Sequence, residues 1–307
     1  MIRFLLFVFC VIFVSPSPQA KDWPNRQVRI IVPFPTGGNN DITARILSKH
    51  LTVALKHPVI VDNKPGAGGT TATKLYLTSQ LDDHTVIMGS SNNIVFSPII
   101  QKQYLVTDLN PVVLLGVGSY LLVANSNIGI KTLSDLIDKA KTQKLTYSSG
   151  GLNTGSHLAM LYFSKIANIE LKHIPYPGGD ASTMALARNE VDISMNSIWN
   201  ILKQYIDQGT FVPLATTNIT REKTLANTPT VSSLFPGFQA LVWFGIFGRN
   251  DHPTEIIDIL SKEINDIISK QLLTDFLIKE GLEPKNVTIK EFKQFINDEY
   301  ERWKPLL

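Results

Sequence analysis

The chain has 307 residues, of which 44% are hydrophobic and 18% charged, and its formal net charge is +3 at pH 7. Basic and acidic residues are interspersed, so no basic stripe indicates a nucleic-acid partner. A single cysteine, Cys10, excludes an intrachain disulfide, and a chain of this length can bury enough surface to fold without one.

The first twenty residues have the pattern of a secretory signal peptide. Arg3 precedes an apolar run over 4–14, and a small, proline-broken tail ends at Ala20. A membrane anchor is the alternative, but the run is shorter than the roughly 20 residues needed to span a bilayer. Cys10 lies inside the run, which disfavours a lipoprotein signal. We therefore expect cleavage near Ala20 and a periplasmic mature chain, residues 21–307.

Short apolar runs typical of strands alternate with amphipathic stretches along most of the chain. The runs lie at 28–34, 59–61, 85–88, 112–117, 121–124, 145–148, 171–175, 191–195, 212–216 and 241–247. Helical spacing occurs over 42–55 and 133–140, and capping boxes stand at 132–135 and 288–291. An apolar stripe over 292–303 is expected to pack in the core. The alternation predicts an α/β fold with largely parallel sheets.

The length favours two domains, and no Pro- or Gly-rich linker separates them. We therefore expect the chain to pass between two lobes more than once, at the break 116–120 and at the turn 235–237. The predicted division is a signal peptide over 1–20, one lobe from 21–119 with 237–307, and a second lobe over 120–236.

Six segments rich in Gly, Ser, Thr and Asn share one character. They are 33–40, 66–73, 89–98, 148–157, 175–179 and 194–200. They contain no Asp, Glu, Lys or Arg, and His157 is their one side chain that titrates near neutrality. Each alone is also compatible with a tight turn or a helix cap. Several follow a strand and precede a helix, where open α/β sheets bind ligands and helix N-termini favour anions. Together they predict a cleft for a small anion.

The motifs of several enzyme classes are missing. Segment 66–71 follows a strand but lacks the last glycine of a dinucleotide fingerprint, and neither a Walker loop nor a G-x-S-x-G elbow occurs. Ser156 and His157 are adjacent, so on a helix they do not face one another. The six histidines show no metal-ligand spacing. We expect no catalytic residue, metal or cofactor, and we interpret His157 as a helix-start donor.

The chain resembles the extracytoplasmic solute receptors of tripartite tricarboxylate transporters, often called Bug-type receptors. The segments that carry the resemblance follow in the family's order over almost the whole mature chain: "WPNRQVRIIVPFPTGGNNDITARIL", "PVIVDNKPGAGGTTAT", "HTVIMGSS", "LTYSSGGLNTGSHLA", "HIPYPGGDASTMAL", "NEVDISMNS", "PLATTN", "NTPTVSSLFPGF" and "VWFGIFG".

The resemblance implies a type II periplasmic binding protein fold, in which two α/β lobes close on a ligand in the cleft between them. It also implies a small organic carboxylate as ligand and a two-subunit membrane permease as partner. We expect a monomer. An exported sensor of the same fold that signals to a membrane kinase is the alternative, and a hydrolase of that fold is a third class, disfavoured by the missing nucleophile.

The resemblance further implies which residues bind the ligand. They are Phe34, Thr36, Gly37, Gly38, Asn39, Asn40, Ser90, Ser91, Asn92, Gly151, Thr154, His157, Tyr176 and Asn196. The sequence departs from the family at Asn39-Asn40, where Ser-Thr is usual, at Pro177, where Lys is usual, and at Asn196, where many members have Asp. The missing carboxylate at Asn196 predicts a preference for an acid without an ammonium group.

Overall fold

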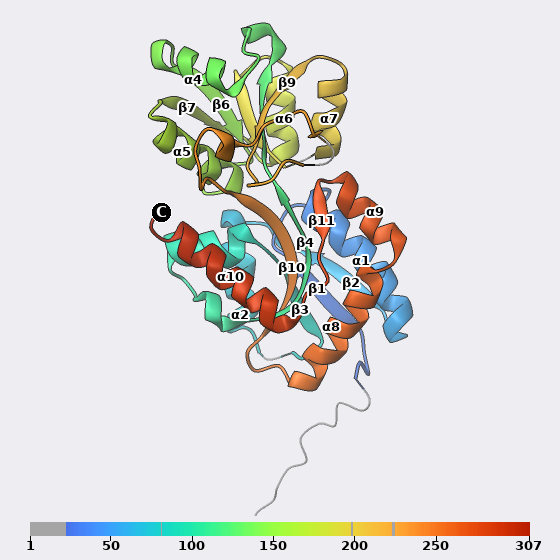
Figure 1. The fold of residues 1–307 in the computed structure, drawn as a ribbon. Helices are drawn as coiled ribbons and strands as arrows, with labels where there is room; N and C mark the ends of the chain where they lie inside the picture. Colours follow the sequence, from blue (N-terminus) through green and yellow to red (C-terminus); the bar gives the residue numbers. More distant parts are fainter. Residues whose placement is uncertain (1–22, 81, 198, 223–224) are drawn as a thin grey trace, which may run out of the picture.

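The computed structural model describes residues 23–307 except 81, 198 and 223–224, and it contains two α/β units, each built around its own sheet (Figure 1). The predicted signal peptide lies outside the described residues. Within the part of the chain that is described, no helix is long and apolar enough to cross a membrane.

The first sheet has six strands in the order β11-β4-β10-β3-β1-β2. β1 is parallel to β2 and β3, whereas β10 is antiparallel to β3 and β4, and β11 is antiparallel to β4. The strands are β1 (Val28–Val32), β2 (Val59–Asn63), β3 (Thr85–Ser90), β4 (Leu109–Ser119), β10 (Leu241–Arg249) and β11 (Leu282–Pro284).

The second sheet has five strands in the order β7-β6-β8-β5-β9. β6 is parallel to β7 and β8, and β5 is antiparallel to β8 and β9. The strands are β5 (Leu121–Asn125), β6 (Leu145–Ser149), β7 (Leu171–Pro175), β8 (Ile193–Asn196) and β9 (Phe211–Thr216).

Every predicted apolar run forms a strand, but the expectation of largely parallel sheets was wrong. Both sheets are mixed, because β4, β5 and β10 carry the chain between the two units and enter each sheet antiparallel to a neighbour. β11 was not predicted, since its three residues show no alternation. The predicted lobe boundaries stay a prediction.

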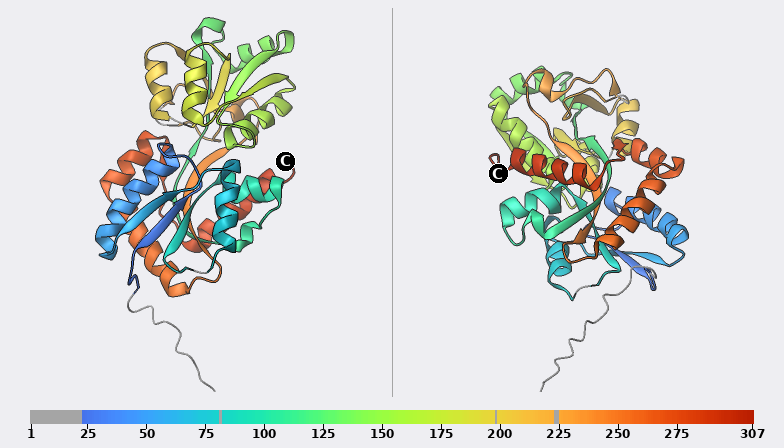
Figure 2. Two further views of the ribbon diagram at one scale, coloured as in Figure 1. Left: turned by 180° about the vertical axis from the view of Figure 1, so that it is seen from behind. Right: turned by 60° about the horizontal axis from the view of Figure 1, so that its bottom comes forward.

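Helices cover both faces of each sheet (Figures 1 and 2). α1, α8 and α9 pack together on one face of the first sheet and α10 lies on the other, while α4 and α5 lie opposite α6 and α7 on the second. The helices are α1 (Asn39–Leu55), α2 (Thr70–Thr78), α3 (Ser97–Gln101), α4 (Leu133–Thr142), α5 (Gly155–Ala167), α6 (Gly179–Ala187), α7 (Trp199–Asp207), α8 (Thr254–Ile268), α9 (Gln271–Lys279) and α10 (Ile289–Trp303).

Local signals in the sequence place two of these helices. The capping boxes Thr132–Asp135 and Thr288–Glu291 both form and start α4 and α10. The C-terminal stripe is core packing, because Phe292, Ile296 and Trp303 on α10 are at most 4% exposed.

The two passages of the chain between the units are bonded to each other. Thr217, fully buried after β9, accepts a hydrogen bond from the Tyr120 N–H through Oγ1 at 2.8 Å. The Thr217 N–H donates to the Tyr120 carbonyl, and the Ala240 N–H donates to the Thr217 carbonyl. The residues directly before β5, after β9 and before β10 therefore form one hydrogen-bonded junction.

Candidate functional site

All six predicted loops lie between the carboxyl end of a strand and the start of a helical segment. They follow β1, β2, β3, β6, β7 and β8. A pocket of about 250 Å³ opens between loops 66–73 and 89–98 of the first unit and loop 148–157 of the second. Its lining residues are Ala67, Gly68, Ser97, Ile100, Gln101, Leu152 and Asn153.

The loop 33–38 is held by the buried carboxylate of Asp41 in the first turn of α1. Asp41 accepts hydrogen bonds from the Gly37 N–H at 2.9 Å, from Arg45 Nε at 3.0 Å and from Asn63 Nδ2 at 2.9 Å. Burial raises the pKa of Asp41, but the bonds from Arg45, Gly37 and Asn63 outweigh it and hold that pKa below its ordinary value. The Gly37 N–H is thus used within the loop.

The start of α1 is half-buried and has no side-chain cap. Gly38 occupies the N-cap position, where no side chain caps the helix, so the first-turn N–H groups have no intrahelical partner. A Cβ added at Gly38 would meet only the Pro35 carbonyl, at 3.8 Å. Asn39 and Asn40 form the first turn, and the buried Oδ1 of Asn40 has no partner among the described residues. Phe34 is half-buried against the core, and Thr36 is exposed.

In the segment after β3, most side chains bond within the first unit. A wide helical turn, η3 (Ser91–Phe96), begins there. The Ser90 N–H donates to Asn93 Oδ1 at 2.9 Å, and Ser91 Oγ donates to the Leu241 carbonyl at 3.2 Å. Asn92 instead reaches the second unit, where its Oδ1 accepts from the Gly155 N–H at 2.8 Å.

The opposing loop leads to the N-terminus of α5. Gly151 has φ +124°, a conformation that favours glycine, and Thr154 at the N-cap position makes no capping bond through its side chain. Ser156 Oγ accepts from the Gly150 N–H at 3.1 Å. In the adjoining loop the Gly178 N–H donates to the Gly150 carbonyl at 3.3 Å, so the starts of α5 and α6 lie side by side.

His157 accepts one hydrogen bond through Nδ1, which leaves the proton of the neutral ring on Nε2, so its predicted role as a donor stays a prediction. Its ring is 8% exposed and stacks on His173 at 4.2 Å between centroids, and Nδ1 accepts from the Asn153 N–H at 3.2 Å. Burial, with the adjacent His173, lowers the pKa of His157 to about 4. His173, which the sequence did not single out, contacts Ser149 Oγ through Nε2 at 2.7 Å. The pair is therefore uncharged at neutral pH.

Two further predicted residues bond within the second unit. The Tyr176 hydroxyl donates to Glu190 at 3.2 Å. Asn196 is buried, and its Nδ2 donates to the Gly179 carbonyl at 2.9 Å and to Thr183 Oγ1 at 3.1 Å. Asn196 therefore holds the first turn of α6, whose N-cap residue Gly178 provides no side chain.

The sequence did not predict a buried acid at the boundary between the two units. Glu280, directly after α9, is 7% exposed, and its Oε2 has no partner among the described residues. Burial raises the pKa of Glu280, whereas Lys279 and the side chain of Asn39 lower it, and Asp180 on α6 adds to the rise. A polar residue after a helix looks like a surface position, so no sequence signal identified it.

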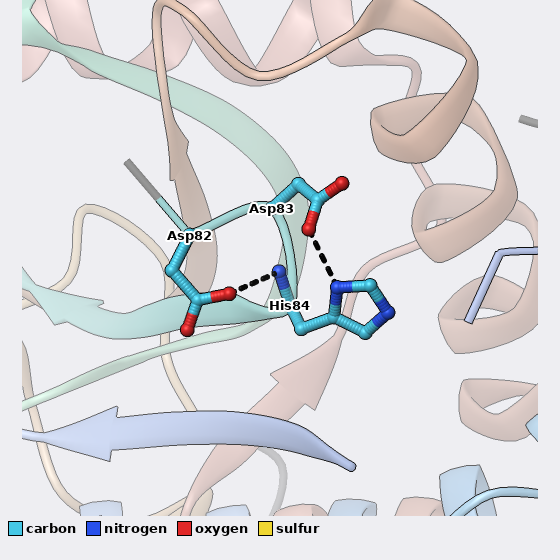
Figure 3. A group of neighbouring side chains, drawn as sticks. All are labelled: Asp82, Asp83 and His84. Atoms are coloured by element: carbon cyan, nitrogen blue, oxygen red, sulfur yellow. Dashed lines mark hydrogen bonds and ion pairs between the residues drawn. The ribbon is translucent and has the colours of Figure 1, made fainter. Parts of the chain in front are cut away.

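A second polar cluster lies away from these loops, in the turn before β3 (Figure 3). Asp82, Asp83 and His84 are close enough together to suggest a metal site. Asp82 instead accepts from Arg26 at 2.6 Å and from Thr85 at 2.7 Å. His84 contacts Asp83 through Nδ1 at 2.5 Å and accepts from a backbone N–H through Nε2. The cluster fastens the N-terminal segment to the sheet.

Comparison with known proteins identifies the family. The model described as the tripartite tricarboxylate transporter family receptor matches residues 43–307. The chain belongs to this family. One curated relative is the UPF0065 protein in the tcbD-tcbE intergenic region of Pseudomonas sp. strain P51, 30% identical over 95% of this chain and 89% of the relative. Protein BugT of Bordetella pertussis is 29% identical over 94% of this chain and 91% of its own length.

Two solved structures share the fold. Rpa4515 of R. palustris, determined with adipate, superposes with a TM-score of 0.84 at 26% identity, covering 93% of this chain and 97% of that one. MatC of Rhodopseudomonas palustris, determined with bound malate, gives a TM-score of 0.84 at 23% identity over 92% and 99%. The predicted periplasmic binding protein fold is confirmed, and the family is one of solute-binding receptors rather than enzymes.

Proposed function

We propose that this protein is a periplasmic receptor that captures a small organic carboxylate between its lobes and delivers it to a two-subunit membrane permease. The observation that carries the proposal is the set of helix starts at the boundary of the two units. In α1, α5 and α6, which all begin there, the side chain of the N-cap residue makes no capping bond. Their N–H groups and dipoles favour an anion, and the loops before them contain no charged side chain.

The chemistry of the site suits a carboxylate held without an arginine clamp. Backbone N–H groups of the three helix starts would donate to one carboxylate, with hydroxyl and amide side chains around it. The adipate-bound relative supports an acid of this size. Closure of the lobes on the ligand would be the signal read by the permease.

The test is thermal unfolding of residues 21–307 against a millimolar panel of mono-, di- and tricarboxylates, amino acids and aromatic acids. A ligand at about 100 times its dissociation constant adds roughly 2.7 kcal/mol, which raises Tm by a few degrees. Gly38→Val is the control. Its backbone suits any residue and its Cβ has room, so Tm without ligand should hold while the added methyl groups occupy the ligand's place and the shift disappears. No shift with any acid, in protein free of co-purified ligand, contradicts the proposal.

Asn196 provides a test of ligand class. We expect the native protein to bind a dicarboxylate better than the matching amino acid. Asn196→Asp should reduce that preference, because it adds a negative charge beside the start of α6, where the ligand is proposed to bind. The variant also loses the bond to the Gly179 carbonyl, at a cost of about 1–2 kcal/mol of stability. Calorimetric titration of both ligands measures the ratio of their dissociation constants. A ratio that is the same in Asn196→Asp and in the native protein contradicts the expectation.

A sensor that signals to a membrane kinase is the alternative. A histidine kinase sensor domain similar to periplasmic binding proteins shares the fold at a TM-score of 0.51 and 11% identity. The transport receptor and the sensor would bind the same ligand but different membrane partners. Pull-down from membranes with the ligand-loaded protein separates them, because a permease subunit supports transport and a kinase supports sensing.

A further inference from the structure

A single hydrogen bond crosses from η3 in the first unit to α5 in the second. The Gly155 N–H, the first of α5, donates to Asn92 Oδ1 at 2.8 Å. We propose that Asn92 is a positioning residue that latches the two lobes together before a ligand arrives, by capping α5 from the opposite lobe. This role rests on the proposed function as a receptor and assigns Asn92 to lobe closure rather than to ligand contact.

The helix that provides the donor, α5, receives no capping bond from its own N-cap residue. Thr154 occupies the N-cap position, but its hydroxyl donates to the Gly151 carbonyl at 2.7 Å and makes no capping bond to α5. An acceptor at a helix start is favoured both by the unpaired N–H groups and by the helix dipole. The Asn92 amide oxygen therefore takes the place that the side chain of Thr154 leaves open.

The fit at Gly155 leaves no room for the helix start to shift toward the first unit. A Cβ added to Gly155 would lie 1.9 Å from the Tyr120 hydroxyl and 3.2 Å from the Phe96 ring. Phe96 belongs to η3, the same segment that carries Asn92. The hydrogen bond and the close packing thus join the same two elements.

The position of the acceptor, Asn92, is fixed by the next residue in the chain, Asn93. Asn93 is fully buried and bonds only within the first unit: its Nδ2 donates to Thr73 Oγ1 at 3.1 Å, its Oδ1 accepts from the Ser90 N–H, and its carbonyl accepts from the Tyr104 hydroxyl at 2.5 Å. Because η3 is held this firmly, the neighbouring amide of Asn92 is presented to α5 in a fixed direction.

A latch of this kind would change the ligand affinity without touching the ligand. If the lobes are already close together, less of the binding free energy is used to close them. Removal of the amide should favour the open arrangement and weaken binding by about tenfold, the effect expected for one hydrogen bond of about 1.4 kcal/mol.

The experiment measures the distance between the lobes without ligand. Residues 21–307 contain no cysteine, so Lys74→Cys on α2 and Lys165→Cys on α5 can carry a nitroxide pair for pulsed EPR. Asn92→Ala should move the distance distribution to longer values, and Asn92→Asp, which keeps the acceptor oxygen, should restore it. Asn125→Ala is the matched control, because this buried asparagine bonds only within the second unit, to the Leu186 carbonyl and the Asn127 N–H, so its loss should lower Tm and leave the distances unchanged.

The outcomes separate the latch from the receptor function. An unchanged distribution in Asn92→Ala overturns the latch, even if the affinity for an acid falls, because the residue would then only contact the ligand. A longer distance in Asn125→Ala, or failure of Asn92→Asp to restore the native distances, also overturns it. Absence of any bound acid would contradict the proposed function, while the ligand-free distances would still decide the latch.

Discussion

At the scale of single residues, the side chains near the candidate site mostly shape the backbone. Asp41 fixes the loop before α1 by accepting the Gly37 N–H, and Asn196 fixes the start of α6 by donating to the Gly179 carbonyl. This leaves the helix N–H groups as the donors of the site. A neutral imidazole at His157 is consistent with that role, because it supports a loop without adding charge.

The depressed pKa of His157 predicts a loss of stability in mild acid. The folded-state pKa is about 4, below the ordinary value of 6.5, so the unfolded chain takes up a proton first as the pH falls. Stability should be unaffected above about pH 6.5 and decline by about 3 kcal/mol toward pH 4. Urea denaturation across this range measures the decline. His157→Gln, which keeps an acceptor, should flatten the curve, and parallel curves would contradict the assignment.

At the scale of elements, α5 is held by residues of both units. It contacts η3 at its start, and Tyr162 stacks on Phe238 at 4.7 Å and meets Trp303 of α10 edge-on at 6.1 Å. A helix of the second unit thus packs against residues near both passages of the chain. Its position couples the candidate ligand loop to the junction between the units.

Gly155→Ala tests this packing. The added Cβ would overlap the Tyr120 hydroxyl. We therefore expect the free energy of unfolding to fall by about 2 kcal/mol, a value typical of overpacking. Tyr120→Phe removes the nearest atom and should recover part of the loss in the double variant. A double-mutant cycle by urea denaturation measures the coupling. Additive effects would show that the two residues do not clash.

The elements also show how far the sequence could predict the fold. Alternating apolar runs located ten strands, and the capping boxes marked the starts of α4 and α10. Strand direction could not be predicted, because an apolar run in a mixed sheet reads the same in either direction. β11 is three residues long and pairs with β4, which is far away in the sequence, so no local pattern predicted it.

At the scale of the whole molecule, the two units are joined by hydrogen bonds at the passages of the chain. Thr217 bonds to Tyr120, and its hydroxyl donates to the Ala240 carbonyl at 2.6 Å. On another side of the junction, the Trp199 indole donates to the Ser119 carbonyl at 2.9 Å and lies against Gly281. The proposed closing of the lobes would bend the chain at this junction.

Thr217→Val should weaken the junction with little change in shape. The valine leaves the Tyr120 N–H and the Ala240 carbonyl without their side-chain partner in a buried place, which costs about 2 kcal/mol. Thr217→Ser keeps the hydroxyl and serves as the control. Urea denaturation measures the loss. Equal losses in both variants would show that the methyl group, and not the hydrogen bonds, supports the junction.

The sequence by itself determined the α/β class, the family and the loops at the ends of the strands, because periodicity, small-residue loops and their order are local features. Only the tertiary structure decided which groups in those loops have partners. Asn92, Tyr176 and Asn196 look alike as polar loop residues, yet one bonds across the two units and the others bond within one. The burial of Glu280 beside Asn39 depends likewise on how α9 packs against α1. Hydrogen bonding and desolvation depend on distances between residues far apart in the chain, which no local pattern contains.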